Sequence, residues 1–280
     1  MTIAMEAERA SGSIGTRLAD GLLRSAAVFW FLVAAAGQWV FVAFILGFYG
    51  APTLGGNFEA WDKNKFLTHG YIAGDTAGNL AFAAHVMLAA IITFGGTLQL
   101  VPQIRARAIG FHRWNGRLFI LTAFVISLTG LFMNAARGST GMFDHLAITL
   151  NALLILLCAG QTLGYVLARD IVTHRRWALR TFMVVNGVWF LRVGMMGWMA
   201  AKIGLFGGPK EFDAGFYAFW SYGSYLVPLV LLELYFWAQE RAGAGGKVAT
   251  AALLFVLAAV TAVGIAGVTM IIWWPLLLIA

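Results

Sequence analysis

The chain has 280 residues, of which 61% are hydrophobic and only 11% are charged, and its mean hydropathy is +0.81. This composition excludes a soluble globular domain, and hydrophobic runs of about 18 residues or more are long enough to cross a bilayer. The predicted fold class is therefore all-α, a polytopic membrane protein. The net charge of +7 requires no nucleic-acid partner, because a basic cytoplasmic collar that faces anionic lipid accounts for it.

The N-terminal segment 1–26 carries charges of both signs and lacks the apolar core and cleavage site of a signal peptide. We expect a short cytoplasmic tail there, followed by a single transmembrane helical domain over residues 27–280. Hydropathy predicts seven spans in this domain, the second to fifth of which form a four-helix core over residues 78–201. The predicted spans cover about residues 27–50, 78–102, 113–134, 145–168, 177–201, 216–238 and 248–276.

Positive charge is distributed unevenly between the two sides of these spans. One side holds the N-terminal tail and the loops after the second, fourth and sixth spans, which are rich in arginine. The other side holds only Lys63, Lys65, Arg137, Lys202 and Lys210. Because short loops rich in Lys and Arg stay in the cytoplasm, we expect a bacterial inner-membrane protein with its N-terminus inside and its C-terminus outside.

Four histidines lie near the ends of the predicted core helices. His112 and His174 open the third and fifth spans at the cytoplasmic boundary, whereas His85 and His145 fall in the outer halves of the second and fourth spans. Paired imidazoles on neighbouring helices are axial ligands of six-coordinate b-type haem. The sequence thus predicts two haem b groups, held by His112 with His174 and by His85 with His145, in layers roughly 25 Å apart.

The two inner histidines lie in similar local sequences. Residues 111–119 and 173–182 share His-Arg followed by Trp, with Arg three residues and Phe five residues after the Trp. Gly116 and Ala178 each follow their histidine by four residues on the same helical face, where a small side chain lets a flat macrocycle approach the backbone. Small residues are equally typical of close helix packing in membranes, so both interpretations stay open.

Each histidine also has a structural interpretation. The flanking Arg and Trp residues fit interfacial anchoring or lipid-headgroup contact for the inner pair. The depth of His85 in an apolar helix indicates a function, and a satisfied interhelical hydrogen bond is the alternative. His145 follows Asp144, an expected N-cap that would orient its imidazole, and it lies a turn or more nearer the surface than His85. His69, in the outer loop, is left unassigned.

Other polar residues within the spans have predicted partners. Glu233 needs a cation because an unpaired carboxylate in lipid is costly, and Arg180 or Arg117 can supply it, either as a structural ion pair or in proton transfer. Arg192 is expected near the outer layer, where it meets a haem propionate or a bound anion, or else snorkels or pairs with an Asp. The single cysteine, Cys158, is expected to serve packing.

The stretch His112–Phe119, together with the His-Arg-Arg-Trp sequence at 174–177 and Glu233, resembles the bacterial polytopic membrane family catalogued as domain of unknown function 2306. This resemblance covers roughly residues 78–238 and implies a fold without an established activity. The placement of the four histidines on successive helices is also similar to transmembrane di-haem cytochromes b. In that family the second and fourth helices hold one haem, the third and fifth hold the other, and the His-Ser-Trp-Leu-Gly motif matches residues 112–116 in its His, Trp and Gly.

Two functional hypotheses follow. The first is a b-type haem protein, a transmembrane oxidoreductase, which carries electrons between a cytoplasmic-side donor or quinol, or another small reductant, and an outer acceptor. The alternative is a non-redox integral membrane protein, a transporter or a structural partner subunit, whose His and Arg residues bind lipid, anion or proton. Beyond the lipid bilayer, the sequence indicates no definite partner and no oligomeric state.

Overall fold

The computed structural model describes residues 2–64, 70–137, 141–204, 207 and 212–279, and for residues 2–14 it describes the backbone alone. His69 lies outside these residues. All regular structure in the described part is helical, which confirms the all-α class. The elements are α1 (Thr2–Phe44), η1 (Ile45–Gly50), α2 (Ala51–Gly55), η2 (Phe58–Lys63), α3 (Thr76–Leu100), α4 (Pro102–Arg107), α5 (Ile109–Arg137), α6 (Met142–Leu167), α7 (Ile171–Val185), α8 (Gly187–Gly204), α9 (Ala214–Glu240), α10 (Ala244–Val268), η3 (Thr269–Trp273) and α11 (Trp274–Leu278).

Among the described residues, six helices are long and apolar enough to cross a membrane, and the bent pair of α7 and α8 adds a seventh candidate. These elements contain the predicted spans or overlap them closely, so the polytopic membrane fold is confirmed. The first candidate span is longer than expected and covers Gly15–Gly55. Helix α1 continues without a break through the segment expected to be a tail.

The fifth predicted span, at 177–201, is not a single straight helix. It is divided at Asn186 into α7 and α8, whose axes differ by 55°. The Asn186 side chain donates to the carbonyl of Phe182 (2.8 Å), and Gly187 starts the next helix. A side-chain amide that binds backbone groups, followed by glycine, favours a helix break even in an apolar segment.

Helices α3, α5, α6 and α7 form the four-helix core, in which each helix packs beside the next along the chain. Small residues allow the close approach. The carbonyl of Gly95 in α3 accepts a hydrogen bond from the Asn115 side chain of α5 (2.8 Å). At Gly96, a Cβ atom would crowd Phe119 of α5 and Phe182 of α7, so these three helices meet there. In a membrane such close packing stabilises the association of helices, because lipid leaves no hydrophobic driving force between them.

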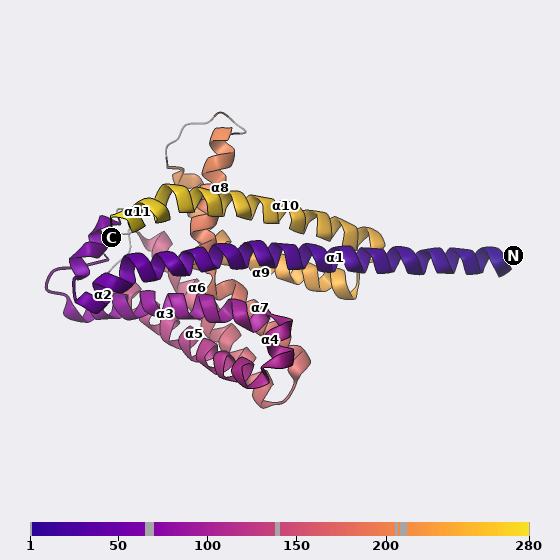
Figure 1. Ribbon diagram of the computed structural model, residues 1–280, viewed down its shortest axis with the longest axis horizontal. Coiled ribbons are helices and arrows are strands. Elements are labelled where there is room, and N and C mark those ends of the chain that lie inside the picture. The colour runs from indigo at the N-terminus through magenta and orange to yellow at the C-terminus, as the bar shows by residue number, and fades with distance from the viewer. Residues whose placement is uncertain (1, 65–69, 138–140, 205–206, 208–211, 280) are drawn as a thin grey trace.

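Helices α1 and α10 lie side by side along the long axis, and the two chain ends lie at opposite ends of the molecule (Figure 1). Polar contacts join distant segments of the chain at both ends of the molecule. The Lys63 ammonium donates to the carbonyl of Ile279 (2.5 Å) beside α2, and Lys247 pairs with Asp20 (2.6 Å) at the other end. Helix α4 lies at the right-hand end of the bundle in Figure 1, the end nearer to the N-terminus.

Candidate functional site

His174 lies in the first turn of α7, and its imidazole is fixed by a neighbouring helix. Its Nδ1 is 2.9 Å from the carbonyl oxygen of Thr162 in α6. A carbonyl only accepts hydrogen bonds, so Nδ1 carries the proton, and in the neutral imidazole Nε2 is the nitrogen with the lone pair. This arrangement, an Nδ1–H donated to a backbone carbonyl, is the one that orients histidine ligands of metals through Nε2.

His112 lies in the first turn of α5 at the same end of the bundle. Arg105 lies close enough for its charge to act on the imidazole, and His174 is the other ionisable group within range. The Nδ1 atom of His112 is buried and has no hydrogen-bond partner among the described residues. Buried polar atoms are nearly always paired, so an unpaired one requires an explanation such as a water, an ion or a bound group.

Gly116, one of the two small residues that follow these histidines, is not open to a macrocycle. A Cβ atom on Gly116 would lie 3.3 Å from the side-chain nitrogen of Gln99 in α3. The same Gln99 nitrogen donates to the backbone carbonyl of His112 (2.8 Å). Gly116 therefore serves the packing of α3 against α5, which is the second of the two interpretations that the sequence left open.

His85 lies in α3 and faces α5. Its Nδ1 is 3.1 Å from the hydroxyl oxygen of Thr129, and this hydroxyl lies 2.9 Å from the Val125 carbonyl and 3.2 Å from the Ile126 carbonyl. These two carbonyls compete for the single hydroxyl proton, which favours the tautomer in which His85 donates from Nδ1. The edge of the ring also lies 3.3 Å from the position that a Cβ would take on Gly130.

His145 lies in the first turn of α6. It contacts α5 nearer its C-terminal end than His85 does. Its carbonyl accepts a hydrogen bond from Asn134 of α5 (3.1 Å). Asn134 follows the Thr129 contact of His85 by five residues, so the two histidines differ in depth by roughly 7.5 Å, about one and a half helical turns. Asp144 is not the N-cap that the sequence suggested: α6 begins at Met142, after Gly141, and Asp144 falls inside the first turn.

Glu233 of α9 and Arg180 of α7 form a two-pronged ion pair, with Nε to Oε1 at 2.6 Å and the second nitrogen to Oε2 at 2.9 Å. Of the two arginines proposed from the sequence, Arg180 therefore holds the carboxylate. Arg117 stacks on the Trp114 ring instead (4.9 Å).

Arg192 of α8 faces α1. Its guanidinium lies 5.5 Å from the centre of the Phe41 ring and donates to the Val188 carbonyl (3.0 Å). No carboxylate among the described residues pairs with it. Its contacts among the described residues involve neither outer histidine, so the expected propionate role stays a prediction.

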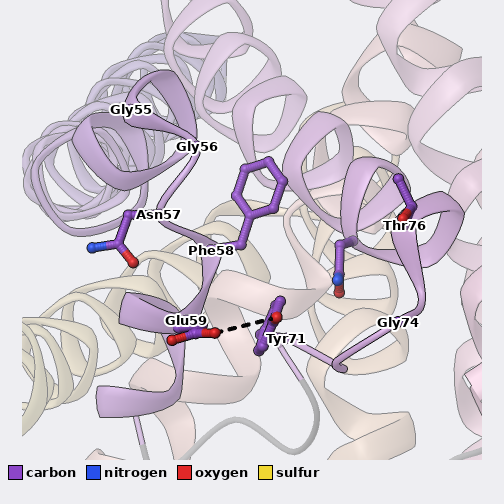
Figure 2. A pocket seen from close by; sticks show the side chains of 9 residues that line it. Gly55, Gly56, Asn57, Phe58, Glu59, Tyr71, Gly74 and Thr76 are labelled. Atoms are coloured by element: carbon purple, nitrogen blue, oxygen red, sulfur yellow. Dashed lines mark hydrogen bonds between the residues drawn. The ribbon is translucent and has the colours of Figure 1, made fainter.

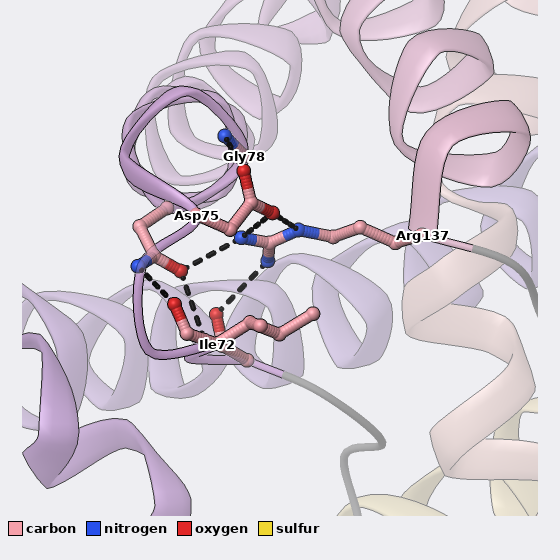
Figure 3. Close-up of polar contacts among 6 residues, drawn as sticks. Ile72, Asp75, Gly78 and Arg137 are labelled. Carbon is pink, nitrogen blue, oxygen red and sulfur yellow. Dashed lines mark hydrogen bonds and ion pairs between the residues drawn. The ribbon is translucent and has the colours of Figure 1, made fainter.

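A polar network where α3 begins and α5 ends was not anticipated (Figure 3). Arg137, which is only 8% exposed, binds the Asp75 carboxylate (2.9 Å), the Asn79 side chain (2.7 Å) and the Gly70 carbonyl (3.2 Å). The Gly78 amide and Arg137 hold the pKa of Asp75 below its ordinary value, although partial burial raises it. The sequence signal was an N-cap motif, Asp75 followed by Gly78, opposite a lone arginine at the end of the next span.

A family model described as "Predicted membrane protein (DUF2306)" matches residues 82–236. No curated protein and no solved structure matches, so the similarity to di-haem cytochromes b stays a prediction. Within the described residues, no group of three or more His, Cys, Asp or Glu side chains could hold a metal ion, whereas a bis-histidine haem requires only two. Because the match covers more than half of the chain, the protein belongs to the family of predicted membrane proteins DUF2306.

Proposed function

We propose that the protein is a b-type haem protein of the bacterial inner membrane, with its N-terminus inside and its C-terminus outside. It passes electrons between a cytoplasmic-side donor or quinol and an outer acceptor. The observation that carries the proposal is the inner histidine pair. His174 has its Nδ1 anchored and its Nε2 free to ligate, and the neighbouring His112 has a buried nitrogen without a partner among the described residues.

His112 and His174 would hold the first haem from α5 and α7. A bound haem would supply a reversible one-electron couple, and the chain supplies ligand orientation and an apolar environment. The basic residues near this end, Arg105 among them, favour an anionic group such as a propionate.

His85 and His145 would hold the second haem. The tautomer in which Nδ1 of His85 donates to Thr129 leaves Nε2 available, which supports a ligand role. Gly130 lies against the His85 ring and follows His112 by 18 residues on α5, so the two layers are about 27 Å apart along the helix. The offset in depth between His145 and His85 gives this outer site less support than the inner one.

A reduced-minus-oxidised visible spectrum of protein purified from haem-supplied cells tests the proposal. We expect an α band of the b type and two haems per chain. His112→Ala and His174→Ala should each remove the inner haem and leave about half of the signal. His69→Ala, which changes the one histidine outside both pairs, is the matched control and should retain all of it. A spectrum without Soret or α bands would eliminate the electron-transfer function.

The alternative function, a non-redox membrane protein that binds anionic lipid, is favoured by one observation. The arginines 105, 107, 113 and 169 are exposed, and none forms an ion pair within the described residues. Protein that lacks haem but whose thermal stability rises with phosphatidylglycerol, and loses that rise when these arginines become glutamine, would establish this function instead.

A further inference from the structure

A cavity of about 530 Å³ opens beside the loop that joins the first span to α3. Figure 2 shows the side chains that line it. It lies between α2, η2 and the start of α3. Its volume is in the range of sites for small molecules. It is lined by Gly55, Gly56, Asn57, Phe58, Glu59, Tyr71, Gly74, Thr76 and Asn79.

The charge of this cavity selects the kind of ligand. Among the nine described lining residues, Glu59 alone carries a formal charge, and it forms no ion pair within the described part of the chain. The Tyr71 hydroxyl donates to its Oε1 (3.4 Å), which leaves Oε2 without a hydrogen bond from the described residues (Figure 2). Asp75 and Arg137, behind the wall, pair with each other. The cavity therefore favours a cation over an anion.

The walls supply aromatic faces and further acceptors. Phe58 is stacked on the buried Trp61 ring (4.7 Å between centroids). Tyr71 lies beside Glu59, to which its hydroxyl donates. Aromatic faces attract ammonium groups. Asn57 and Thr76, on opposite sides of the cavity (Figure 2), offer further side-chain oxygens as acceptors.

The remaining lining residues give shape rather than binding groups. The Asn79 side chain is already engaged, because it exchanges hydrogen bonds with the backbone of Ile72 (2.9 and 3.1 Å) and accepts from Arg137. Nothing lies within 4 Å of the positions that Cβ atoms would take on Gly55, Gly56 and Gly74. These glycines leave the cavity open where larger side chains would fill it.

We propose that this cavity binds a primary ammonium group, either of a phosphatidylethanolamine headgroup or of a free small amine. Its place at the boundary of the first span supports access from lipid. Leu54, next to the cavity, is 91% exposed, which fits a short helix lying against acyl chains. Glu59 binds the ammonium, and Phe58 and Tyr71 enclose it.

Ethanolamine is the probe, and purified full-length protein in an amine-free detergent buffer is the sample. We expect saturable binding by saturation-transfer NMR together with a rise in melting temperature. Glu59→Gln should weaken binding at least about tenfold, because it removes a charge-assisted hydrogen bond. Asp62→Asn, a matched carboxylate on the same short helix outside the cavity, should leave the affinity unchanged.

A second variant blocks the space without touching the carboxylate. Gly55→Trp should abolish ethanolamine binding while haem content and melting temperature without ligand stay as in the wild type. Nanodiscs of phosphatidylglycerol with and without phosphatidylethanolamine identify the source. A stabilisation by phosphatidylethanolamine that is lost in Glu59→Gln assigns the lipid, and stabilisation by ethanolamine alone assigns a free amine.

Three results would overturn the proposal. They are equal ethanolamine affinity in Glu59→Gln and wild type, equally tight binding of neutral ethylene glycol, and no saturable binding in either arm of the experiment.

Discussion

At the scale of single residues, the pairing of Glu233 with Arg180 shows how this chain places charge inside an apolar bundle. Arg180 is enclosed more than its partner, with 18% of its side chain exposed against 44%. The guanidinium also stacks on the rings of Trp177 (4.7 Å) and Phe236 (5.6 Å). Removing the carboxylate would leave a charge among aromatic rings and lipid, which is more costly than losing a surface contact.

We therefore predict that Glu233→Ala destabilises the protein by about 1.5–3 kcal/mol, the range for hydrogen bonds to charged groups. The matched control is Glu240→Ala, which breaks the exposed pair with Arg176 (2.7 Å) at the same end and should cost no more than about 1 kcal/mol. Thermal unfolding in one detergent measures both. A double-mutant cycle with Arg180→Ala should show positive coupling, and additive losses would contradict the pairing.

Asp75 provides a test based on pH. Folding lowers its pKa below the ordinary 3.8, first through the Gly78 amide and then through Arg137. The unfolded carboxylate therefore binds a proton before the folded one as the pH falls. The stabilisation is complete above about pH 5 and decreases as the pH falls below 3.8 towards the folded pKa.

The measurement is the difference in melting temperature between wild type and Asp75→Asn, which keeps an acceptor for Gly78 and removes the charge. This difference should be constant from pH 7 to about pH 5 and should narrow below pH 3.8. Asp62→Asn, at an exposed carboxylate, should show a small difference throughout. A difference for Asp75→Asn that widens with acid would mean that the carboxylate does not stabilise the folded state.

At the scale of elements, glycines determine how closely α10 approaches α8. A Cβ on Gly264 of α10 would collide with the carbonyl oxygen of Val193 in α8, and it would also lie 2.8 Å from a Val193 methyl carbon. A backbone atom cannot move aside as a side chain can. The contact is therefore possible only with glycine at this position.

We predict that Gly264→Ala lowers stability by about 1–3 kcal/mol, the usual cost of overpacking a filled interface. Gly245→Ala is the control on the same helix, because nothing lies within 4 Å of its Cβ position. That change should be neutral or slightly stabilising, since alanine is the better helix former. Equal effects of the two substitutions on thermal unfolding would show that α10 does not pack on α8 at Gly264.

At the scale of the whole molecule, the sequence predicted the spans well because crossing a membrane requires a length of apolar helix that hydropathy detects directly. It missed the bend at Asn186, because an average over the span hides the effect of one Asn-Gly step. It also missed the Asp75–Arg137 network, which depends on contacts between residues far apart in sequence. The sequence predicted that His145 lies nearer the membrane surface than His85, because residue counts along helices give depth. It could not predict the hydrogen-bond partner of each imidazole, because that partner depends on how the helices pack.

The bend at Asn186 makes the topology a test of the whole fold. If α7 and α8 together cross the membrane, the chain has an odd number of spans and its ends lie on opposite sides. The contact of Lys63 with Ile279 and the separation of the chain ends in Figure 1 agree with this arrangement. If the pair is a re-entrant loop, every segment after Gly204 changes side.

We predict the first arrangement, which reporter fusions at three helix ends can measure. A cytoplasmic reporter should be active after Leu167 and after Glu240, and an outer-compartment reporter should be active after Ile279. The fusion after Leu167 precedes the bend and is the internal control, because both arrangements place it inside. A Glu240 fusion active outside, together with an Ile279 fusion active inside, would identify a re-entrant α7–α8 pair. Gly204 would then lie on the same face of the membrane as His174, and no span formed by α7 and α8 would cross beside the outer histidines.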